Sequence, residues 1–482
     1  MNEQLRVPAT TSAVTRSGLS RVTLRIVAGA LMVGFVYGYD QGSIAGAALF
    51  LTAQFGLTPF DISVIVTAVP VGTFAGAIVA GKVTNRIGRK RSIMAIAVGF
   101  AVFSALQGFA VDMWTLAAVR MGLGLVVGIS LVAAPQFIAE STTTRVRGSA
   151  LVSFQIAGAV GLVVSYLVSV ALAPGENWRL ILGLAAIPGV LAVFVLRPLP
   201  DTPHWYLAKG RRSDAARVLR AVEPGDDPET HLGRIEEDLK SVGSDTYKQL
   251  LKPPMRRAGI FAVGLGLLVQ VTGINAIVYY SPAILTDIGF GSAQGALLGS
   301  AVLQMIGLAA VCVAFLVVDR WGRRPVLMSG ITVMIVANAV LMIAFTIGDA
   351  KFLGAVGVAL FLIGFQFGYG ALVWVYAAES LPAQLRAVGA SVLMAADLFG
   401  NIVVGIFFPN AMAAMGGTAT FGLFLVMSVI ALAFIAKLAP EVKGRQLEEI
   451  REYWERGGRW AQRPERRPAQ SEVDSRTRSS DG

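Results

Sequence analysis

The stretch Asn85-Arg86-Ile87-Gly88-Arg89-Lys90 has a counterpart later in the chain, Asp319-Arg320-Trp321-Gly322-Arg323-Arg324. A second pair of matching stretches, Ala139-Glu140-Ser141 and Ala378-Glu379-Ser380, recurs at nearly the same separation, and an arginine follows each at the same spacing. Matching motifs at a common separation indicate an internal duplication. The chain is therefore expected to consist of two related halves.

Long apolar stretches surround these motifs. Twelve of them have about the 20 residues that a helix needs to cross a bilayer, and they lie at 22–44, 61–83, 92–111, 114–138, 148–172, 178–197, 257–286, 294–318, 326–347, 352–377, 387–411 and 418–438. A polar insert at 198–256 separates them into six and six. The repeats follow equivalent spans of the same direction, so we expect two parallel halves, an arrangement typical of transporters with a site near the midplane. The predicted fold class is an all-α integral membrane protein of twelve transmembrane helices in two six-helix repeats.

The composition supports a membrane protein. Of the 482 residues, 55% are hydrophobic and 15% charged, against about 25% charged in soluble proteins. The chain has one cysteine, Cys312, and two histidines. An intrachain disulfide and a Cys-x-x-Cys site are therefore excluded, and little remains for a histidine-based metal site.

The basic residues predict the orientation. Of 41 Lys and Arg, Arg120 lies within a span and only Arg179 and Lys351 lie in loops opposite the insert. Because Lys and Arg gather in cytoplasmic loops, the insert and both termini are expected in the cytoplasm, and topology rather than nucleic acid explains the net charge of +11. The predicted organisation is a tail at 1–21, halves at 22–197 and 257–438, a linker with short helices at 198–256, and a partly disordered tail at 439–482. The expected location is the plasma (inner) membrane, with multiple passes.

Asp40 and Arg120 are charged residues within apolar spans, where a functional role is the default hypothesis. Helical rise places Asp40 about 9 Å and Arg120 about 12 Å below the same edge of a ~30 Å apolar core. The two charges therefore lie at a similar depth and can neutralise each other, and protonation of Asp40 would free Arg120. This pattern predicts proton coupling. The alternative is a static ion pair that fixes helix packing.

Several motifs in order along the chain resemble those of the sugar porter family of the major facilitator superfamily. They are Gly38-Tyr39-Asp40-Gln41-Gly42, Gly88-Arg89-Lys90, Pro135-Gln136-Phe137-Ile138-Ala139-Glu140, Trp178-Arg179, Gly273-Ile274-Asn275-Ala276 with Gln270, Tyr279 and Tyr280, and Pro440-Glu441-Val442-Lys443-Gly444-Arg445. The resemblance extends from about residue 25 to about residue 450. It implies the major facilitator fold and sugar transport.

The resemblance also implies roles for single residues. Asp40 matches a position that is acidic in proton-coupled members, and Arg120 matches its partner. The implied sugar contacts are Gln155, Gln270, Asn275, Trp374 and Asn401, and Tyr279 and Tyr280 are implied gate residues. Amides suit sugar hydroxyls and an aromatic ring suits the C–H face. The alternatives are interhelical hydrogen bonding for Gln155 and Asn401, and core or lipid packing for Trp374.

The chain departs from the family pattern at the implied site. Val269 replaces a frequent second glutamine, Gly307 stands at a polar contact of the eighth span, and Gly370-Ala371-Leu372-Val373 replaces Gly-Pro-x-Pro. Asp397 lies one turn before Asn401, where an amide is more usual, and is a candidate to contact substrate, to titrate, or to form an interhelical hydrogen bond. The identity of the sugar therefore stays open.

A further set of charges lies at the inner ends of the spans and is expected to lock the inner face through pairs between the halves. It comprises Arg86, Glu140, Arg147, Asp319, Arg320, Glu379 and Arg386. Because an exposed pair contributes only about 0–1 kcal/mol, the set would act as a network. Topology-setting charge is the alternative for the arginines, but it does not explain the glutamates.

The sequence thus predicts a proton-coupled symporter that imports a monosaccharide or related polyol by alternating access, acting as a monomer in the lipid bilayer. No cofactor is expected beyond the proton as coupling ion. The alternatives are a facilitative uniporter or exporter, which Asp40 disfavours, and a non-transporting sugar sensor, which usually has a longer tail. An enzyme is not expected, because the spans contain no nucleophile–base pair or metal constellation.

Overall fold

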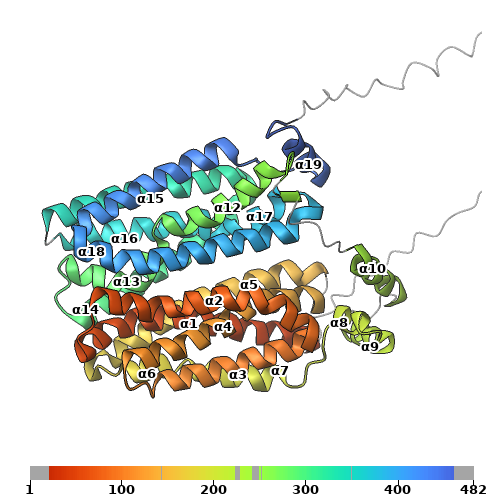
Figure 1. The fold of residues 1–482 in the computed structure, drawn as a ribbon, viewed down its shortest axis with the longest axis horizontal. Helices are drawn as coiled ribbons and strands as arrows, with labels where there is room; N and C mark the ends of the chain where they lie inside the picture. Colours follow the sequence, from red (N-terminus) through yellow and green to blue (C-terminus); the bar gives the residue numbers. More distant parts are fainter. Residues whose placement is uncertain are drawn as a thin grey trace, which may run out of the picture.

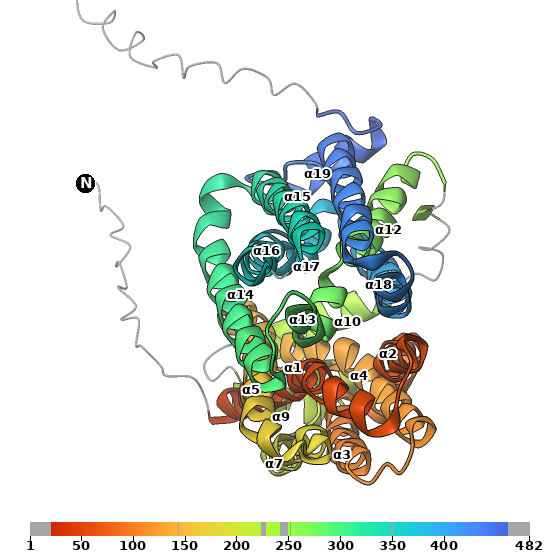
Figure 2. The same ribbon diagram turned by 90° about the vertical axis from the view of Figure 1, so that its left-hand side faces the viewer.

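The computed structural model describes residues 21–142, 144–222, 228–241, 249–250, 252–348 and 350–460, and these residues form helices and turns only. The N-terminal half contains α1 (Arg21–Phe55), α2 (Pro59–Ile87), α3 (Arg89–Gln107), α4 (Met113–Ser141), α5 (Thr144–Leu172), the short helix η1 (Ala173–Gly175), α6 (Trp178–Gly183) and α7 (Ala186–Leu196). Figures 1 and 2 show this half in red to yellow, beside the C-terminal half in green to blue.

The C-terminal half is built of more interrupted helices. It contains α12 (Arg256–Val271), α13 (Ile274–Asp287), α14 (Ala293–Trp321), α15 (Arg323–Ile347), α16 (Lys351–Phe365), the π-helical turn η2 (Gln366–Gly370), α17 (Ala371–Ser380), η3 (Ala383–Leu385) and α18 (Arg386–Leu438). The 53 residues of α18 include Gly416 at φ 77°, so this element contains two passes joined at a kink. This explains why two predicted spans appear as one helix.

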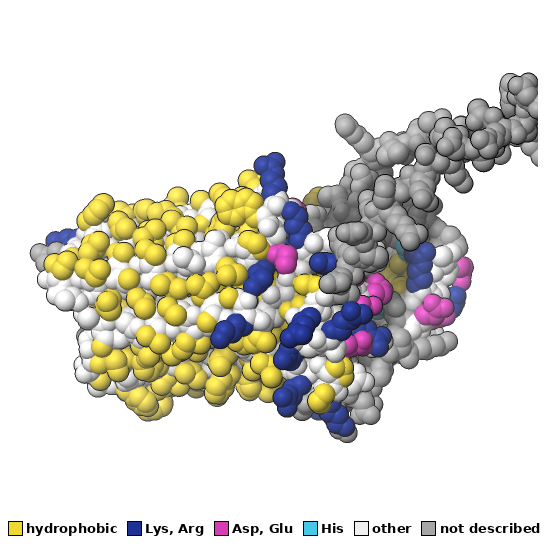
Figure 3. Space-filling model, turned by 90° about the horizontal axis from the view of Figure 1, so that it is seen from above, with side chains coloured by type: hydrophobic (Ala, Val, Ile, Leu, Met, Phe, Trp, Pro, Cys, Tyr) yellow, Lys and Arg dark blue, Asp and Glu magenta, His cyan; other side chains and the backbone are white. Residues whose placement is uncertain are grey.

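Ten helical stretches among the described residues are long and apolar enough to cross a membrane. The 35-residue α1 adds one pass, and α18 counts as two, which accounts for the twelve predicted spans. Hydrophobic side chains cover the flank of the bundle seen in Figure 3, while lysines and arginines gather toward one end. The surface therefore has the pattern of a transmembrane protein.

Four short helices mark that end of the bundle. They are α8 (Pro203–Ala208), α9 (Arg212–Val222) and α10 (Pro228–Ser241), from the polar insert, and α19 (Leu447–Glu455), after the last span. We call it the linker end, and the opposite end the far end.

In α9 and α10, Arg212 is paired with Glu229 at 2.7 Å and with Glu236, and these contacts raise the pKa of the Arg212 guanidinium.

Close backbone packing positions the centre of the N-terminal half. A side chain on Gly38 would place its Cβ 1.8 Å from the carbonyl oxygen of Gly158, so α1 and α5 touch through their backbones. Only glycine permits this approach. Because Gly38 precedes Asp40 by two residues, the contact fixes the position of that carboxylate in the bundle.

The two halves meet toward the far end. The Tyr166 hydroxyl of α5 donates to the carbonyl of Val278 at 2.6 Å and lies 3.0 Å from the Ser281 hydroxyl, both on α13. Near the start of α2, Thr67 lies against Gly405 of α18, where an added Cβ would come within 2.5 Å of the threonine methyl. The halves are therefore closed against each other at the far end.

Candidate functional site

A small cavity of about 20 Å³ lies between the two halves. The N-terminal half lines it with residues of α1, α2 and α4, including Tyr37, Asp40 and Arg120. The C-terminal half contributes Tyr279 from α13 and Asn401 from α18. The candidate proton-coupling residues and two of the candidate substrate or gate residues therefore share one cavity.

Asp40 and Arg120 are both buried, with 3% and 1% of their surfaces exposed. Arg120 Nη1 lies 3.4 Å from Asp40 Oδ1. The same Nη1 donates to Gln107 Oε1 at 2.9 Å, and Nε donates to the Ile65 carbonyl at 3.0 Å. The guanidinium therefore bonds two neutral acceptors at shorter distances than the carboxylate. Loss of the Asp40 charge would leave Arg120 with hydrogen-bond partners.

Gln107 is a part of this arrangement that we did not identify from the sequence. It is the last residue of α3 and is fully buried, although a polar residue near the end of a span is usually interfacial. Its depth in the membrane could have identified it, because Gln107 lies near the same membrane edge as Arg120. Buried polar groups require partners, and Arg120 provides one.

A chain of hydrogen bonds crosses the C-terminal half. Asn275 Nδ2 donates to Gln270 Oε1 at 2.5 Å, and Gln270 Nε2 donates to Asp397 Oδ1 at 2.8 Å. Gln270 lies on α12 and Asn275 on α13, on either side of a break at Gly273 with φ 106°. This left-handed conformation favours glycine, and across it Asn275 reaches Gln270, which in turn reaches Asp397 of α18. Within the described residues, the structure records no cation paired with Asp397.

Asn401 and Tyr279 line the C-terminal side of the cavity, and Tyr280 follows Tyr279 on α13. Asn401 Nδ2 donates to the Tyr279 hydroxyl at 3.4 Å, while Asn401 Oδ1 is buried and has no hydrogen-bond partner. The Tyr280 hydroxyl donates to the Gly405 carbonyl at 3.2 Å, which ties α13 to α18. A buried acceptor without a partner is uncommon in proteins. It is available to a hydroxyl group that enters the cavity.

Two further candidates are not among the residues that line this cavity. Trp374 is half-buried on α17 and packs against the apolar core. It follows the π-helical turn Gln366–Gly370, and such turns are frequent at functional sites. Gln155 is exposed on α5, and the structure gives it no hydrogen bond to another described residue. No recorded hydrogen bond joins Gln155 to Gln270 or Asn275, so its substrate contact stays a prediction.

At the linker end, the two halves repeat one arrangement of charges. Arg89 Nε lies 3.1 Å from Glu140, and Arg323 Nε lies 2.8 Å from Glu379. Asp319 also pairs with Arg323, at 3.1 Å. Among the described residues, each ion pair recorded here joins groups of the same half, so pairing between the halves stays a prediction.

The remaining arginines of the predicted lock differ in their surroundings. Arg86 and Arg320 are exposed in the last turns of α2 and α14, whereas Arg89 and Arg323 begin the following helices and turn inward. Arg386 is half-buried, and its Nε has no hydrogen-bond partner. The side chain of Arg147 lies outside the described residues. Each copy of the sequence motif contains two such arginines, but the motif does not show which of the two faces the glutamate.

Two carboxylates complete each copy of this arrangement. Asp201 Oδ1 accepts from the backbone N–H of Arg89 at 2.9 Å and of Lys90 at 3.2 Å. Glu441 accepts in the same way from Arg323 at 3.3 Å and Arg324 at 3.0 Å. Each carboxylate therefore caps a membrane helix from the chain that follows the last span of its half. We did not assign these roles from the sequence, because they depend on which chain segments meet in space.

Comparison with known proteins agrees with this geometry. A family model described as "Sugar (and other) transporter" matches residues 26–454. A putative metabolite transport protein of Bacillus subtilis, YwtG, is 32% identical over 421 residues, which cover 86% of this chain and 92% of that protein. The galactose-proton symporter of Escherichia coli is 31% identical over 428 residues, with 87% and 92% covered.

A solved structure shows the same fold. The xylose transporter XylE from E. coli, in a partially occluded inward open conformation, superposes with a TM-score of 0.79 at 22% sequence identity, covering 89% of this chain and 100% of that one. The chain is thus a multi-pass membrane protein with the major facilitator fold, and its class is a transporter rather than an enzyme. It belongs to the sugar porter family. The predicted fold class and family resemblance are confirmed.

Proposed function

We propose that this sugar transporter is a proton-coupled symporter, which imports a monosaccharide or related polyol by alternating access. The observation that carries the proposal is the buried pair of Asp40 and Arg120 in the wall of the central cavity. An ionisable pair at this depth is expensive in a membrane and usually marks an ion or proton pathway. Two relatives of this chain are a galactose-proton symporter and an arabinose-proton symporter of E. coli.

The geometry supports a separable pair rather than a static one. When Asp40 takes up a proton, its attraction to Arg120 is lost, while the Ile65 carbonyl and Gln107 still hold the guanidinium. The proton therefore releases α1 from α4 without leaving a buried cation unpartnered. Tyr37 of α1 and Asn401 of α18 line the same cavity, so a shift of α1 changes the surface that the substrate meets.

The C-terminal wall supports a polyhydroxylated substrate. Asn401 Oδ1 offers a buried acceptor, and the chain from Asn275 through Gln270 to Asp397 alternates donors and acceptors. Sugar hydroxyls both donate and accept, so Asn401 in the cavity lining, with the amide chain in the same half, can pair with several of them. Trp374 adds an aromatic surface for the C–H face of a ring.

The orientation follows from the charges. Lysines and arginines gather at the linker end (Figure 3). We therefore place the protein in the plasma membrane, with that end and both termini in the cytoplasm. The halves are closed at the far end by Tyr166 and α13, so this structure corresponds to a state closed to the outside. The protein functions as a monomer, because both walls of the cavity come from one chain.

The test is uptake of labelled sugars and polyols by proteoliposomes of the wild type and of Asp40→Asn. We expect the variant to exchange substrate across the membrane but to lose accumulation driven by a pH gradient. Glu176→Gln, which neutralises an exposed carboxylate in a loop, is the control and should accumulate normally. Accumulation by Asp40→Asn would refute coupling through this residue. Wild-type exchange without accumulation would identify a uniporter, and binding without exchange would identify a sensor.

A further inference from the structure

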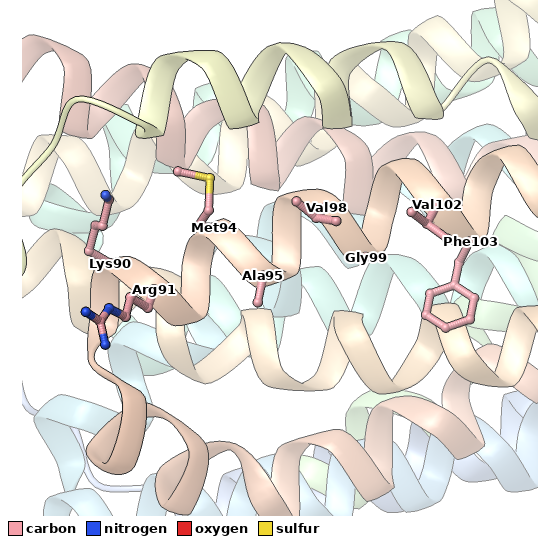
Figure 4. A pocket seen from close by; sticks show the side chains of 8 residues that line it. All are labelled: Lys90, Arg91, Met94, Ala95, Val98, Gly99, Val102 and Phe103. Carbon is pink, nitrogen blue, oxygen red and sulfur yellow. The ribbon is translucent and has the colours of Figure 1, made fainter.

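A groove of about 520 Å³ lies along the outer face of α3 and is separate from the central cavity. Figure 4 shows Lys90 and Arg91 at its linker end and Met94, Val98, Val102 and Phe103 along its length. One end of the groove is therefore basic and the rest is apolar.

The apolar part faces the membrane. Val98 is 45% exposed and Val102 is 48% exposed, which is unfavourable in water but expected against lipid. From Arg91 to Phe103 the helix rises about 18 Å, somewhat more than half of the ~30 Å apolar core of a bilayer. The groove thus has about the depth of one leaflet.

The basic end carries charge that the protein itself leaves uncompensated. Lys90 Nζ donates to the carbonyl of Arg197 at 3.1 Å, which is a neutral acceptor. Arg91 is exposed, and the described part of the chain gives its side chain no hydrogen bond or ion pair. The nearby carboxylates are already engaged, because Glu140 pairs with Arg89 and Asp201 accepts from backbone N–H groups, including that of Lys90. Two positive charges therefore remain at the mouth of the groove.

The second half of the protein provides an internal comparison. Helix α15 begins Arg323-Arg324-Pro325 where α3 begins Arg89-Lys90-Arg91. Arg324 donates to the Ala436 carbonyl as Lys90 donates to that of Arg197, so this contact is common to both halves. Arg91 is an additional cation, because Pro325 stands at its equivalent position. The sugar-transport scaffold does not require Arg91, since the other half lacks it.

We propose that this groove binds an anionic glycerophospholipid, with the headgroup phosphate on Arg91 and Lys90 and one acyl chain along Val98 and Val102. The charge of the mouth selects a negative headgroup, and the apolar length matches an acyl chain within one leaflet. This site is independent of the proposed proton coupling, since none of these residues touches the central cavity.

The test measures lipid binding to the purified, delipidated full chain by native mass spectrometry, with phosphatidylglycerol and phosphatidylcholine as probes. We expect the wild type to prefer phosphatidylglycerol, and Arg91→Gln to weaken its binding roughly fivefold, the effect of one charge near a membrane surface. Arg91→Lys should restore binding. Lys82→Gln removes an exposed charge from α2 at the same end and should bind as the wild type does.

A second variant tests the groove itself. Val98→Trp keeps both charges but fills the apolar floor, and it should also lose phosphatidylglycerol. Size-exclusion profiles and thermal unfolding check that each variant is folded. Equal binding of the two lipids, an equal effect of Lys82→Gln, or full binding by Val98→Trp would each overturn the proposal. A dimer in the mass spectra that phosphatidylglycerol does not dissociate would also overturn the proposal, because a second protein copy rather than lipid would then cover the groove.

Discussion

The two halves of this transporter are most alike at the linker end and least alike where they face each other. At the linker end, Arg89 with Glu140 matches Arg323 with Glu379 in residue type and contact. At the centre, the N-terminal half holds a buried ion pair, whereas the C-terminal half holds amides joined to Asp397. The duplication has therefore kept the frame of the linker end and diverged at the cavity.

This contrast agrees with a division of tasks between the halves. A buried ion pair whose cation also bonds neutral acceptors suits proton uptake. A chain of alternating donors and acceptors suits hydroxyl groups. Asp397 is the exception, because it places a carboxylate among the amides of the C-terminal half. The predictions that follow test whether the two central regions differ as much as their contacts suggest.

The largest effect is expected from Arg120→Met. This change leaves the buried Asp40 carboxylate without a cation and deprives Gln107 and the Ile65 carbonyl of their donor. Removing one partner of a buried ion pair typically lowers the free energy of unfolding by about 3–5 kcal/mol. Asp40→Asn should lower it less, by about 1–3 kcal/mol, because Arg120 keeps two acceptors. Thermal unfolding of the purified proteins in detergent measures both.

The double variant, Asp40→Asn with Arg120→Met, sharpens this comparison. It removes both charges, so its loss of stability should be smaller than the sum of the two single losses. Equal losses for the two single variants would show that Gln107 and Ile65 do not support Arg120 in the way the distances indicate. The pair would then be the static one considered from the sequence.

Asp397→Asn is expected to have an intermediate effect, on substrate recognition rather than on stability. The asparagine oxygen can still accept from Gln270, so the chain of hydrogen bonds survives while the charge is lost. A hydrogen bond to a charged group contributes about 1.5–3 kcal/mol, and we expect roughly a tenfold rise in the KM for substrate with accumulation retained. Uptake kinetics with and without a pH gradient separate the two quantities.

The result distinguishes two roles for this carboxylate. If Asp397→Asn abolished accumulation as Asp40→Asn is expected to do, the C-terminal half would share the proton site and the division of tasks would be wrong. If neither KM nor accumulation changed, Asp397 would serve only to hold Gln270. Glu176→Gln again provides a neutralised carboxylate far from the cavity.

Much of this arrangement can be predicted from the sequence, because charges in apolar spans are rare and conspicuous. Asp40 and Arg120 share a depth that helical rise alone reveals, and the structure places their side chains 3.4 Å apart. The twelve spans follow from apolar length. The break at Gly273 and the turn at Gln366–Gly370 cannot be predicted in this way, because hydropathy does not show whether a long apolar stretch is one helix or two.

The roles that sequence reasoning did not assign depend on contacts between distant segments. Two of the residues concerned, Asp201 and Glu441, bond helices that lie far from them in the chain. Gln107 bonds Arg120 on the helix that follows the next turn. Tyr166 joins α5 to α13 across the two halves. Nothing in the local composition of these residues separates them from solvated or interfacial polar residues, so only the packed fold assigns their partners.

The smallest expected difference lies at the linker end, where the halves are most alike. Glu140 and Arg89 have side chains only 11% and 9% exposed, whereas Glu379 and Arg323 are 38% and 18% exposed. Glu140 also accepts from the Thr202 hydroxyl at 2.5 Å. Glu140→Gln should therefore lower the free energy of unfolding by about 1–2 kcal/mol, and Glu379→Gln by about 0–1 kcal/mol, because solvent screens the more exposed pair.

Thermal unfolding at low and high salt measures this difference and tests its cause. Salt should reduce the effect of Glu379→Gln more than that of Glu140→Gln, since screening acts on exposed charges. A larger loss from Glu379→Gln, or the same salt dependence for both variants, would mean that burial does not set the strength of these pairs. The two copies of the arrangement would then be energetically equivalent despite their different exposure, and the divergence of the halves would be confined to the cavity.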